Sequence, residues 1–176
     1  ISYIVAFTIV AFLVIDFLIV RNLFPNLIAP VVSYGIEHKI YHHDLLKSRK
    51  IETNFSQRKY NVCTDKNSFK TDCKNILREK KIFDIAFMGD SFTEGVGFNY
   101  NDSFVGLVDK KLELFDVANL AVSTYSPTIY YAKIKYLLSK KYSFKEVIVF
   151  IDISDIQDEV DYNLNSDDVV VARSNL

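Results

Sequence analysis

Three short apolar runs alternate with two amphipathic stretches in the second half of the chain. The runs are residues 82–88 (IFDIAFM), 115–122 (FDVANLAV) and 146–153 (EVIVFIDI), and Val, Ile and Phe dominate them. Short runs of this kind are typical of strands that are buried on both faces. The pattern therefore predicts three strands of a parallel sheet.

The two stretches between these runs have helical periodicity. In residues 101–114 (NDSFVGLVDKKLEL) apolar residues share one helix face, and Asp102 or Ser103 is the expected N-cap. Residues 126–141 (SPTIYYAKIKYLLSKK) carry a second apolar stripe and end in two lysines, which suit a helix C-terminus. The order is β-α-β-α-β, which predicts an α/β fold with right-handed crossovers.

The first twenty residues are almost entirely apolar. Residues 1–20 contain a single charge, Asp16, and a helix of this length rises about 30 Å, enough to cross a bilayer. We expect a transmembrane helix over residues 1–21, with a cleavable signal peptide as the rival interpretation. Asp16 is expected to reach the interface near the helix end rather than to act as a proton relay.

Residues 22–80 are polar and are expected to form an irregular juxtamembrane linker, followed by the main domain over 81–176. His42 and His43 lie in this linker; adjacent histidines do not share a helix face, which favours a surface or packing role over metal binding. Cys63 and Cys73 are spaced to close a small loop as a disulfide, although two free thiols fit the spacing equally. No CxxC pair indicates zinc.

Composition narrows the class of protein. Lys and Arg (21) nearly balance Asp and Glu (22), so no basic field indicates nucleic-acid binding. The length suits one domain with a core and a short appendage. The chain starts inside an apolar run at Ile1 and stops at Leu176 without a closing helix, so we expect a truncated sequence.

Polar clusters follow each predicted strand: GDS (89–91), STYS (123–126) and SD (154–155). The carboxyl ends of parallel strands meet at one edge, so these clusters are expected to form one site. Gly89 permits a sharp turn before Ser91, whose hydroxyl is the candidate nucleophile. The lipase-type G-x-S-x-G elbow is missing, which argues against an α/β-hydrolase. The P-loop and G-x-G-x-x-G motifs are missing too, so no nucleotide is expected, and we predict neither a cofactor nor a metal.

The stretch FMGDSFTEG (87–95) resembles the first block of the SGNH (GDSL-type) hydrolases, and the likeness extends over about residues 81–160. The resemblance implies a flavodoxin-like three-layer α/β/α fold with Ser91 as nucleophile, supported by Gly89 and Asp90. NLAVST matches the second block around Asn119, with Thr124 in place of its glycine.

DISD (152–155) stands where the third block reads Gly-x-Asn-Asp, so that Ser154 replaces the asparagine and Asp155 is kept. The resemblance thus implies an oxyanion hole made by the N–H groups of Ser91 and Thr124 and by the Ser154 hydroxyl. Its fourth part, an Asp-x-x-His, is not found after Ser91 and is expected beyond Leu176.

The resemblance implies a membrane-anchored serine esterase or acyltransferase that acts on ester-linked acyl groups, with acylated cell-envelope glycans as a candidate substrate. The soluble domain is expected outside the cytoplasm, on a single-pass anchor. The altered positions Thr124, Asp152 and Ser154 leave open a catalytically degenerate binding or assembly module. A third alternative is a structural subunit that recruits partners through Asp16.

Overall fold

The computed structural model describes residues 2–23 and 34–173, with the side chains of residues 3–15 and 34–173. Asp16 therefore lies outside the described side chains. The helices are α1 (Ser2–Leu23), α2 (Ser91–Glu94), α3 (Phe104–Lys111), α4 (Pro127–Ser139) and α5 (Ile153–Asp158). The strands are β1 (Gly35–His38), β2 (His42–Leu45), β3 (Arg49–Phe55), β4 (Arg58–Thr64), β5 (Ile82–Met88), β6 (Val117–Asn119), β7 (Ser143–Val149), β8 (Tyr162–Leu164) and β9 (Val170–Ala172).

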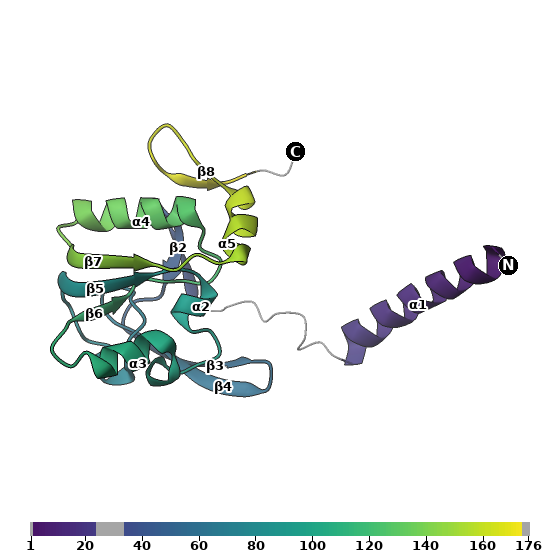
Figure 1. Cartoon of the computed structure of the whole chain (residues 1–176), viewed down its shortest axis with the longest axis horizontal. Helices are drawn as coiled ribbons and strands as arrows, with labels where there is room; N and C mark the ends of the chain where they lie inside the picture. The colour runs from purple at the N-terminus through teal and green to yellow at the C-terminus, as the bar shows by residue number, and fades with distance from the viewer. Residues whose placement is uncertain (1, 24–33, 174–176) are drawn as a thin grey trace.

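The predicted parallel sheet is present. Its three strands have the order β6-β5-β7, and both pairs are parallel. Helix α3 joins β5 to β6, and α4 joins β6 to β7 across β5; the two helices lie on opposite sides of the sheet (Figure 1). The α/β class predicted from the sequence is confirmed in this form.

The helix boundaries follow local sequence signals. Ser103 is the N-cap of α3, and its hydroxyl accepts the N–H of Gly106 at 3.2 Å, which resolves the choice between Asp102 and Ser103. Pro127 starts α4, where its missing N–H removes no helical hydrogen bond. Both helices bury apolar side chains against the sheet, among them Val105 and Ile129.

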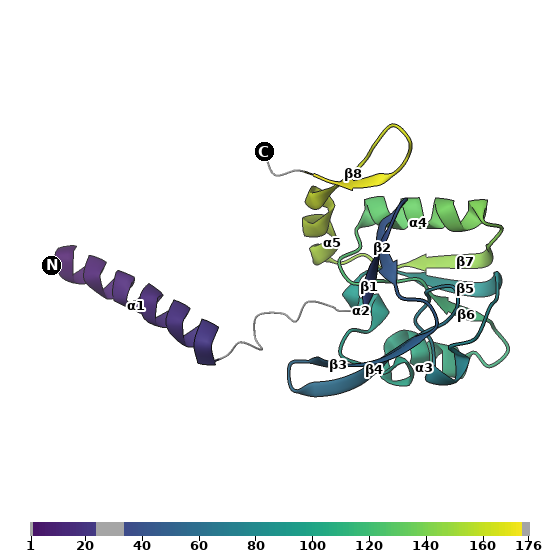
Figure 2. The ribbon, with the colours of Figure 1, turned by 180° about the vertical axis from the view of Figure 1, so that it is seen from behind.

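The region expected to be an irregular linker is ordered from Tyr34 onward. It forms two antiparallel hairpins, β1–β2 and β3–β4, and contributes Tyr34, Leu45, Val62 and Phe69 to the same core as β5 and α4. The β1–β2 hairpin lies beside α4 and α2 (Figure 2). Polar composition concealed these strands because their outward positions carry most of the charge.

Cys63 and Cys73 form a disulfide that ties the end of β4 to the 3-10 turn Cys73–Asn75. Between them, Lys70 pairs through isolated bridges with Thr64 and with Asn119 at the end of β6. The β3–β4 hairpin is thereby joined to the edge of the parallel sheet.

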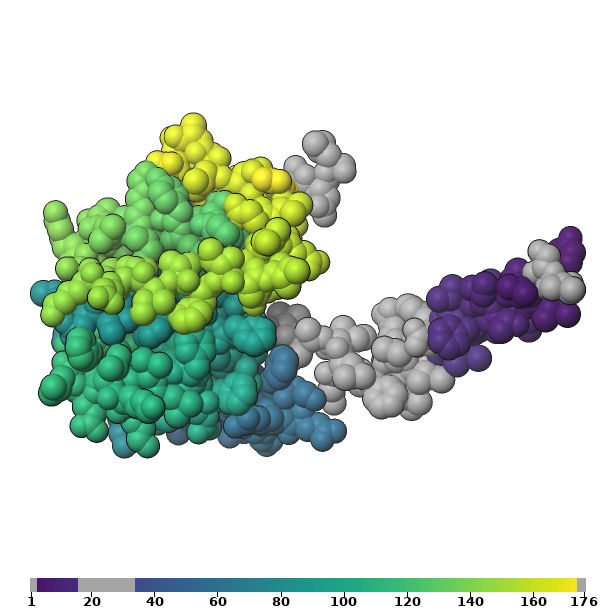
Figure 3. All heavy atoms as spheres, in the orientation of Figure 1, coloured from purple at the N-terminus to yellow at the C-terminus, as the bar shows by residue number. Residues whose placement is uncertain are grey.

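The third apolar run, residues 146–153, is more exposed than predicted. Strand β7 ends at Val149 rather than 153, and Val147, Val149 and Ile151 are 39%, 45% and 62% exposed. In the described part of the chain β7 pairs only with β5, so one edge and part of its surface face outward (Figure 3). The prediction that this run is buried on both faces is therefore wrong.

Residues Ser2–Leu23 are helical, as the apolar run indicates. Among the described residues no helix combines the length and apolarity needed to cross a membrane.

Candidate functional site

The turn after β5 requires glycine and presents Ser91. A Cβ atom on Gly89 would lie 2.2 Å from Thr93 Oγ1 and 3.2 Å from the Phe150 carbonyl oxygen. Asp90 then caps α2 by accepting the Phe92 N–H at 2.9 Å, and Ser91 is the first residue of this short helix. A close-packed turn therefore fixes Ser91 at the carboxyl end of a central strand.

The Ser91 hydroxyl is half-buried and donates to Asp90 Oδ2 at 3.2 Å. No imidazole is hydrogen-bonded to it within residues 34–173. The Ser91 N–H likewise has no acceptor in the described chain, as expected for the first N–H of a helix. The arrangement offers a hydroxyl and a free N–H at the same residue.

The loop after β7 joins this group. Asp152 caps α5 in a capping box with Asp155. The Asp152 side chain accepts the Ser154 N–H at 2.6 Å, and the Asp155 side chain accepts the Asp152 N–H at 3.0 Å. The Ser154 hydroxyl lies 2.5 Å from Asp152 Oδ1 and 3.2 Å from Asp90 Oδ2. Ser91 and Ser154 thus share the Asp90 carboxylate, and the first and third polar clusters meet as expected.

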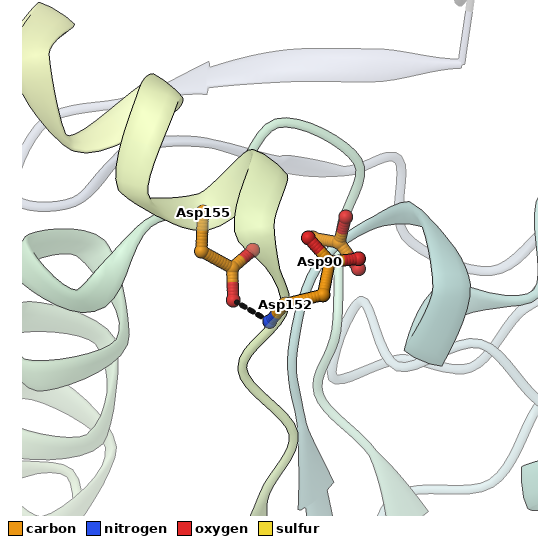
Figure 4. Close-up of side chains that lie close together, drawn as sticks. All are labelled: Asp90, Asp152 and Asp155. Carbon is orange, nitrogen blue, oxygen red and sulfur yellow. Dashed lines mark hydrogen bonds between the residues drawn. The ribbon is translucent and has the colours of Figure 1, made fainter.

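Three carboxylates converge between these loops (Figure 4). Asp90, Asp152 and Asp155 each offer an oxygen within 4.8 Å of the others, and no Lys or Arg pairs with them in the described chain. Burial, together with the charges of Asp90 and Asp152, raises the pKa of Asp155; the Ser154 hydroxyl lowers the pKa of Asp152. Oxygen ligands of this kind suit a divalent cation, so these residues are the ones that would hold a metal.

The second polar cluster is positioned by Asn119. Its buried amide donates to the Thr93 carbonyl at 2.9 Å and its oxygen accepts the Ala121 N–H at 3.1 Å, so the end of β6 is held against α2. Thr124 has φ +65°, in the left-handed region that favours glycine. This is the position at which the resemblance implies a glycine.

Thr124 has no direct hydrogen bond to Ser91 or Ser154 in the structure. Its N–H finds no acceptor among residues 34–173, and its hydroxyl lies 3.3 Å from His43 Nε2. The second cluster therefore reaches α2 through another residue, Glu94.

Glu94 is a site residue that the sequence reasoning missed. Its fully buried carboxylate accepts the Ser123 N–H at 2.7 Å and the Tyr34 hydroxyl at 2.9 Å. Burial raises its pKa, and the nearby Lys70 ammonium opposes that rise. The signal was available, because Glu94 follows Ser91 by one helical turn in GDSFTEG.

His43 was expected at the surface or in packing, and the structure places it against the second cluster. Its Nε2 lies 3.0 Å from the Ser123 carbonyl oxygen, although 80 residues separate them in sequence. The Tyr125 hydroxyl donates to the His43 carbonyl at 2.7 Å. The N-terminal hairpin thus contacts the second polar cluster through His43.

No family model, no curated protein and no solved structure matches the chain. Function is therefore inferred from the geometry of these loops and from the chemistry of their side chains.

Proposed function

We propose that this protein is an SGNH-like serine esterase or acyltransferase that acts on ester-linked acyl groups. Ser91 is the nucleophile. The N–H groups of Ser91 and Thr124 and the hydroxyl of Ser154 stabilise the oxyanion.

One observation carries the proposal: Ser91 stands at the carboxyl end of β5, next to Asp90 and Ser154, with its own N–H free of an acceptor in the described chain. In open α/β sheets, ligands bind outside the carboxyl ends of the strands where the strand order reverses. The order β6-β5-β7 reverses at β5, and the cluster lies between the ends of β5 and β7. This order also fits the first three strands of a flavodoxin-like sheet.

The chemistry is an acyl transfer. Ser91 Oγ forms a bond to the acyl carbon and gives its proton to a base; the bond from that carbon to the alcohol oxygen breaks, and the alcohol leaves with a proton. Water or a second alcohol then accepts the acyl group from Ser91. The resemblance implies a histidine as the base, and residues 92–176 contain none.

Location outside the cytoplasm fits the same proposal. The Cys63–Cys73 disulfide favours an oxidising compartment, where an esterase of cell-envelope glycans would work. Membrane attachment through residues 1–20 stays a prediction from the sequence.

A binding or assembly module is the second candidate. It is favoured by the hydrogen bonds of Ser91 and Ser154, whose hydroxyls both donate to carboxylates rather than facing a base or an empty oxyanion position. In such a module the same loops would bind an acylated ligand without cleaving it.

Labelling with a fluorophosphonate probe separates these two functions. In the full-length protein we expect covalent labelling that is lost in Ser91→Ala and retained in Ser139→Ala, which removes an exposed serine at the end of α4. Labelling is read as the mass shift of the intact protein.

Two outcomes contradict the proposal that the protein is a serine esterase or acyltransferase. The first is an unlabelled wild-type protein, and the second is labelling that persists in Ser91→Ala. Either result, in a protein whose circular dichroism spectrum is native, favours the binding module.

A further inference from the structure

Ser123 is held through its N–H and through its carbonyl by groups from distant parts of the chain. Glu94 on α2 accepts the Ser123 N–H at 2.7 Å. His43 on β2 lies 3.0 Å from the Ser123 carbonyl oxygen through its Nε2 atom. The loop is therefore clamped between α2 and the N-terminal hairpin.

These contacts constrain where the ring protons of both histidines lie. A carbonyl oxygen only accepts, so His43 Nε2 carries the hydrogen that it donates to Ser123. His43 Nδ1 lies 2.8 Å from His42 Nδ1, so one hydrogen lies between these two nitrogens. Burial lowers the pKa of His43, which favours a neutral ring protonated on Nε2, and we therefore assign His42 Nδ1 as the donor to His43 Nδ1.

Because the peptide bond between Ser123 and Thr124 is planar and trans, the contact of His43 with the Ser123 carbonyl fixes the direction of the Thr124 N–H. The carbonyl of Ser123 and the N–H of Thr124 belong to one peptide plane and point in opposite directions. Since His43 holds the carbonyl, the Thr124 N–H must point away from His43. That N–H has no acceptor within residues 34–173, and Thr124 keeps a left-handed φ of +65° to present it.

We propose that His43 is a positioning residue for acyl transfer: by holding the Ser123 carbonyl, it aims the Thr124 N–H at the oxyanion. The inference rests on the proposed function and deepens it. His43 does not touch the substrate. It acts through the Ser123–Thr124 peptide, and it comes from the hairpin that precedes the main sheet.

The test compares two amides at position 43. In His43→Gln the side-chain nitrogen reaches the place of Nε2 and can donate to Ser123, whereas the shorter amide of His43→Asn reaches only the place of Nδ1. Loss of one oxyanion donor costs about 10²–10³ in rate. We expect His43→Asn to slow fluorophosphonate labelling of Ser91 by at least about tenfold and His43→Gln to restore it to within about threefold.

The outcomes distinguish this inference from the proposed function. If wild-type Ser91 is labelled and both variants are labelled at the wild-type rate, His43 has no positioning role while the esterase stands. Equal slowing of labelling in both variants also overturns the inference, because the nitrogen of His43→Gln at the place of Nε2 would then not restore the labelling rate. An unlabelled wild-type protein overturns the proposed function and the positioning role with it.

A second measurement does not depend on activity or on a folded variant. Long-range ¹H–¹⁵N spectra of the wild-type protein report the ring tautomers directly. We expect His43 to be the Nε2-H tautomer and His42 to be protonated at Nδ1 at neutral pH. An Nδ1-H tautomer at His43 is incompatible with a bond to the Ser123 carbonyl and overturns the proposal.

Discussion

At the residue scale, Thr124 is a residue whose type does not suit its backbone conformation. A β-branched residue in the left-handed region is uncommon, and such conformations cost on the order of 1–3 kcal/mol. Thr124 has φ +65°, and Glu94 and His43 hold the N–H and the carbonyl of the preceding residue, Ser123. Backbone strain of this kind is concentrated at binding and catalytic sites.

Replacing Thr124 by glycine should therefore relieve strain. We expect Thr124→Gly to raise the free energy of unfolding by about 1 kcal/mol, since the relieved strain exceeds the entropic cost of glycine of about 0.5–1 kcal/mol. Thr53→Gly in strand β3 is the matched control and should lower it by about 1 kcal/mol. Urea unfolding measures both values, and equal destabilisation at the two positions would show that Thr124 is not strained.

The candidate nucleophile could be predicted at this scale, but its surroundings could not. Ser91 follows an apolar run and a glycine, a local pattern that indicates an exposed hydroxyl after a strand. His43 carries no such local signal, and Glu94 carries only its spacing of one helical turn after Ser91. The roles of both residues depend on Ser123, which lies 29 residues from Glu94 and 80 from His43.

At the element scale, a buried ion pair attaches the N-terminal hairpin to α4. Lys133 on α4 donates to Asp44 Oδ1 on β2 at 2.9 Å, and the two side chains are 0% and 5% exposed. Lys133 also donates to the Leu120 carbonyl, while Asp44 accepts the Tyr41 hydroxyl. Each charge is surrounded by partners, so removal of either one leaves the other buried and unpaired.

A double-mutant cycle measures the coupling free energy between Asp44 and Lys133. We expect Asp44→Asn and Lys133→Met each to lower the free energy of unfolding by about 3–5 kcal/mol, and the double variant to lose much less than their sum. The exposed pair Lys135–Asp168, at 51% and 52%, is the control, with a coupling below about 1 kcal/mol. Additive losses at Asp44 and Lys133 would mean that the hairpin is held by apolar packing alone.

The elements themselves follow from the sequence to different degrees. Strand β5 has the predicted bounds, and α3 and α4 lie inside the predicted stretches, because each has a strong apolar period and a local cap or proline. The hairpins over 35–64 escaped prediction since their alternation is short and interrupted by charged residues. Their stability comes from contacts with β5 and α4 rather than from their own propensity.

At the scale of the whole molecule, burial of Lys70 links stability to pH. Its ammonium donates to the Gly95 and Phe98 carbonyls inside the protein. Burial lowers its pKa from 10.5 to about 8, and Lys133 shifts in the same direction. The folded protein therefore releases a proton near pH 8 that the unfolded chain keeps until about pH 10.5.

Lys70 makes the unfolded chain bind more protons than the folded protein above pH 8, so its own contribution to stability rises with pH there. Burial also raises the pKa of tyrosines such as Tyr34 and Tyr41, which lowers stability near pH 10, where the unfolded chain loses tyrosine protons first. We therefore expect the difference in free energy of unfolding between the wild-type protein and Lys70→Met to grow in favour of the wild type by about 1 kcal/mol from pH 8 to 9, measured by urea unfolding. A difference that stays flat or shrinks over this window would contradict the burial of a titrating Lys70.

Sequence alone determined the parallel β-α-β-α-β unit, the place of Ser91 after its first strand, and the meeting of Ser91 with Ser154 at one edge. These features depend on local periodicity and on the general geometry of parallel sheets. Tertiary structure alone decided the strained backbone of Thr124, the clamp by Glu94 and His43, the convergence of Asp90, Asp152 and Asp155, and the outward-facing β7. Each of these depends on contacts between residues far apart in the chain, and no local pattern encodes such contacts.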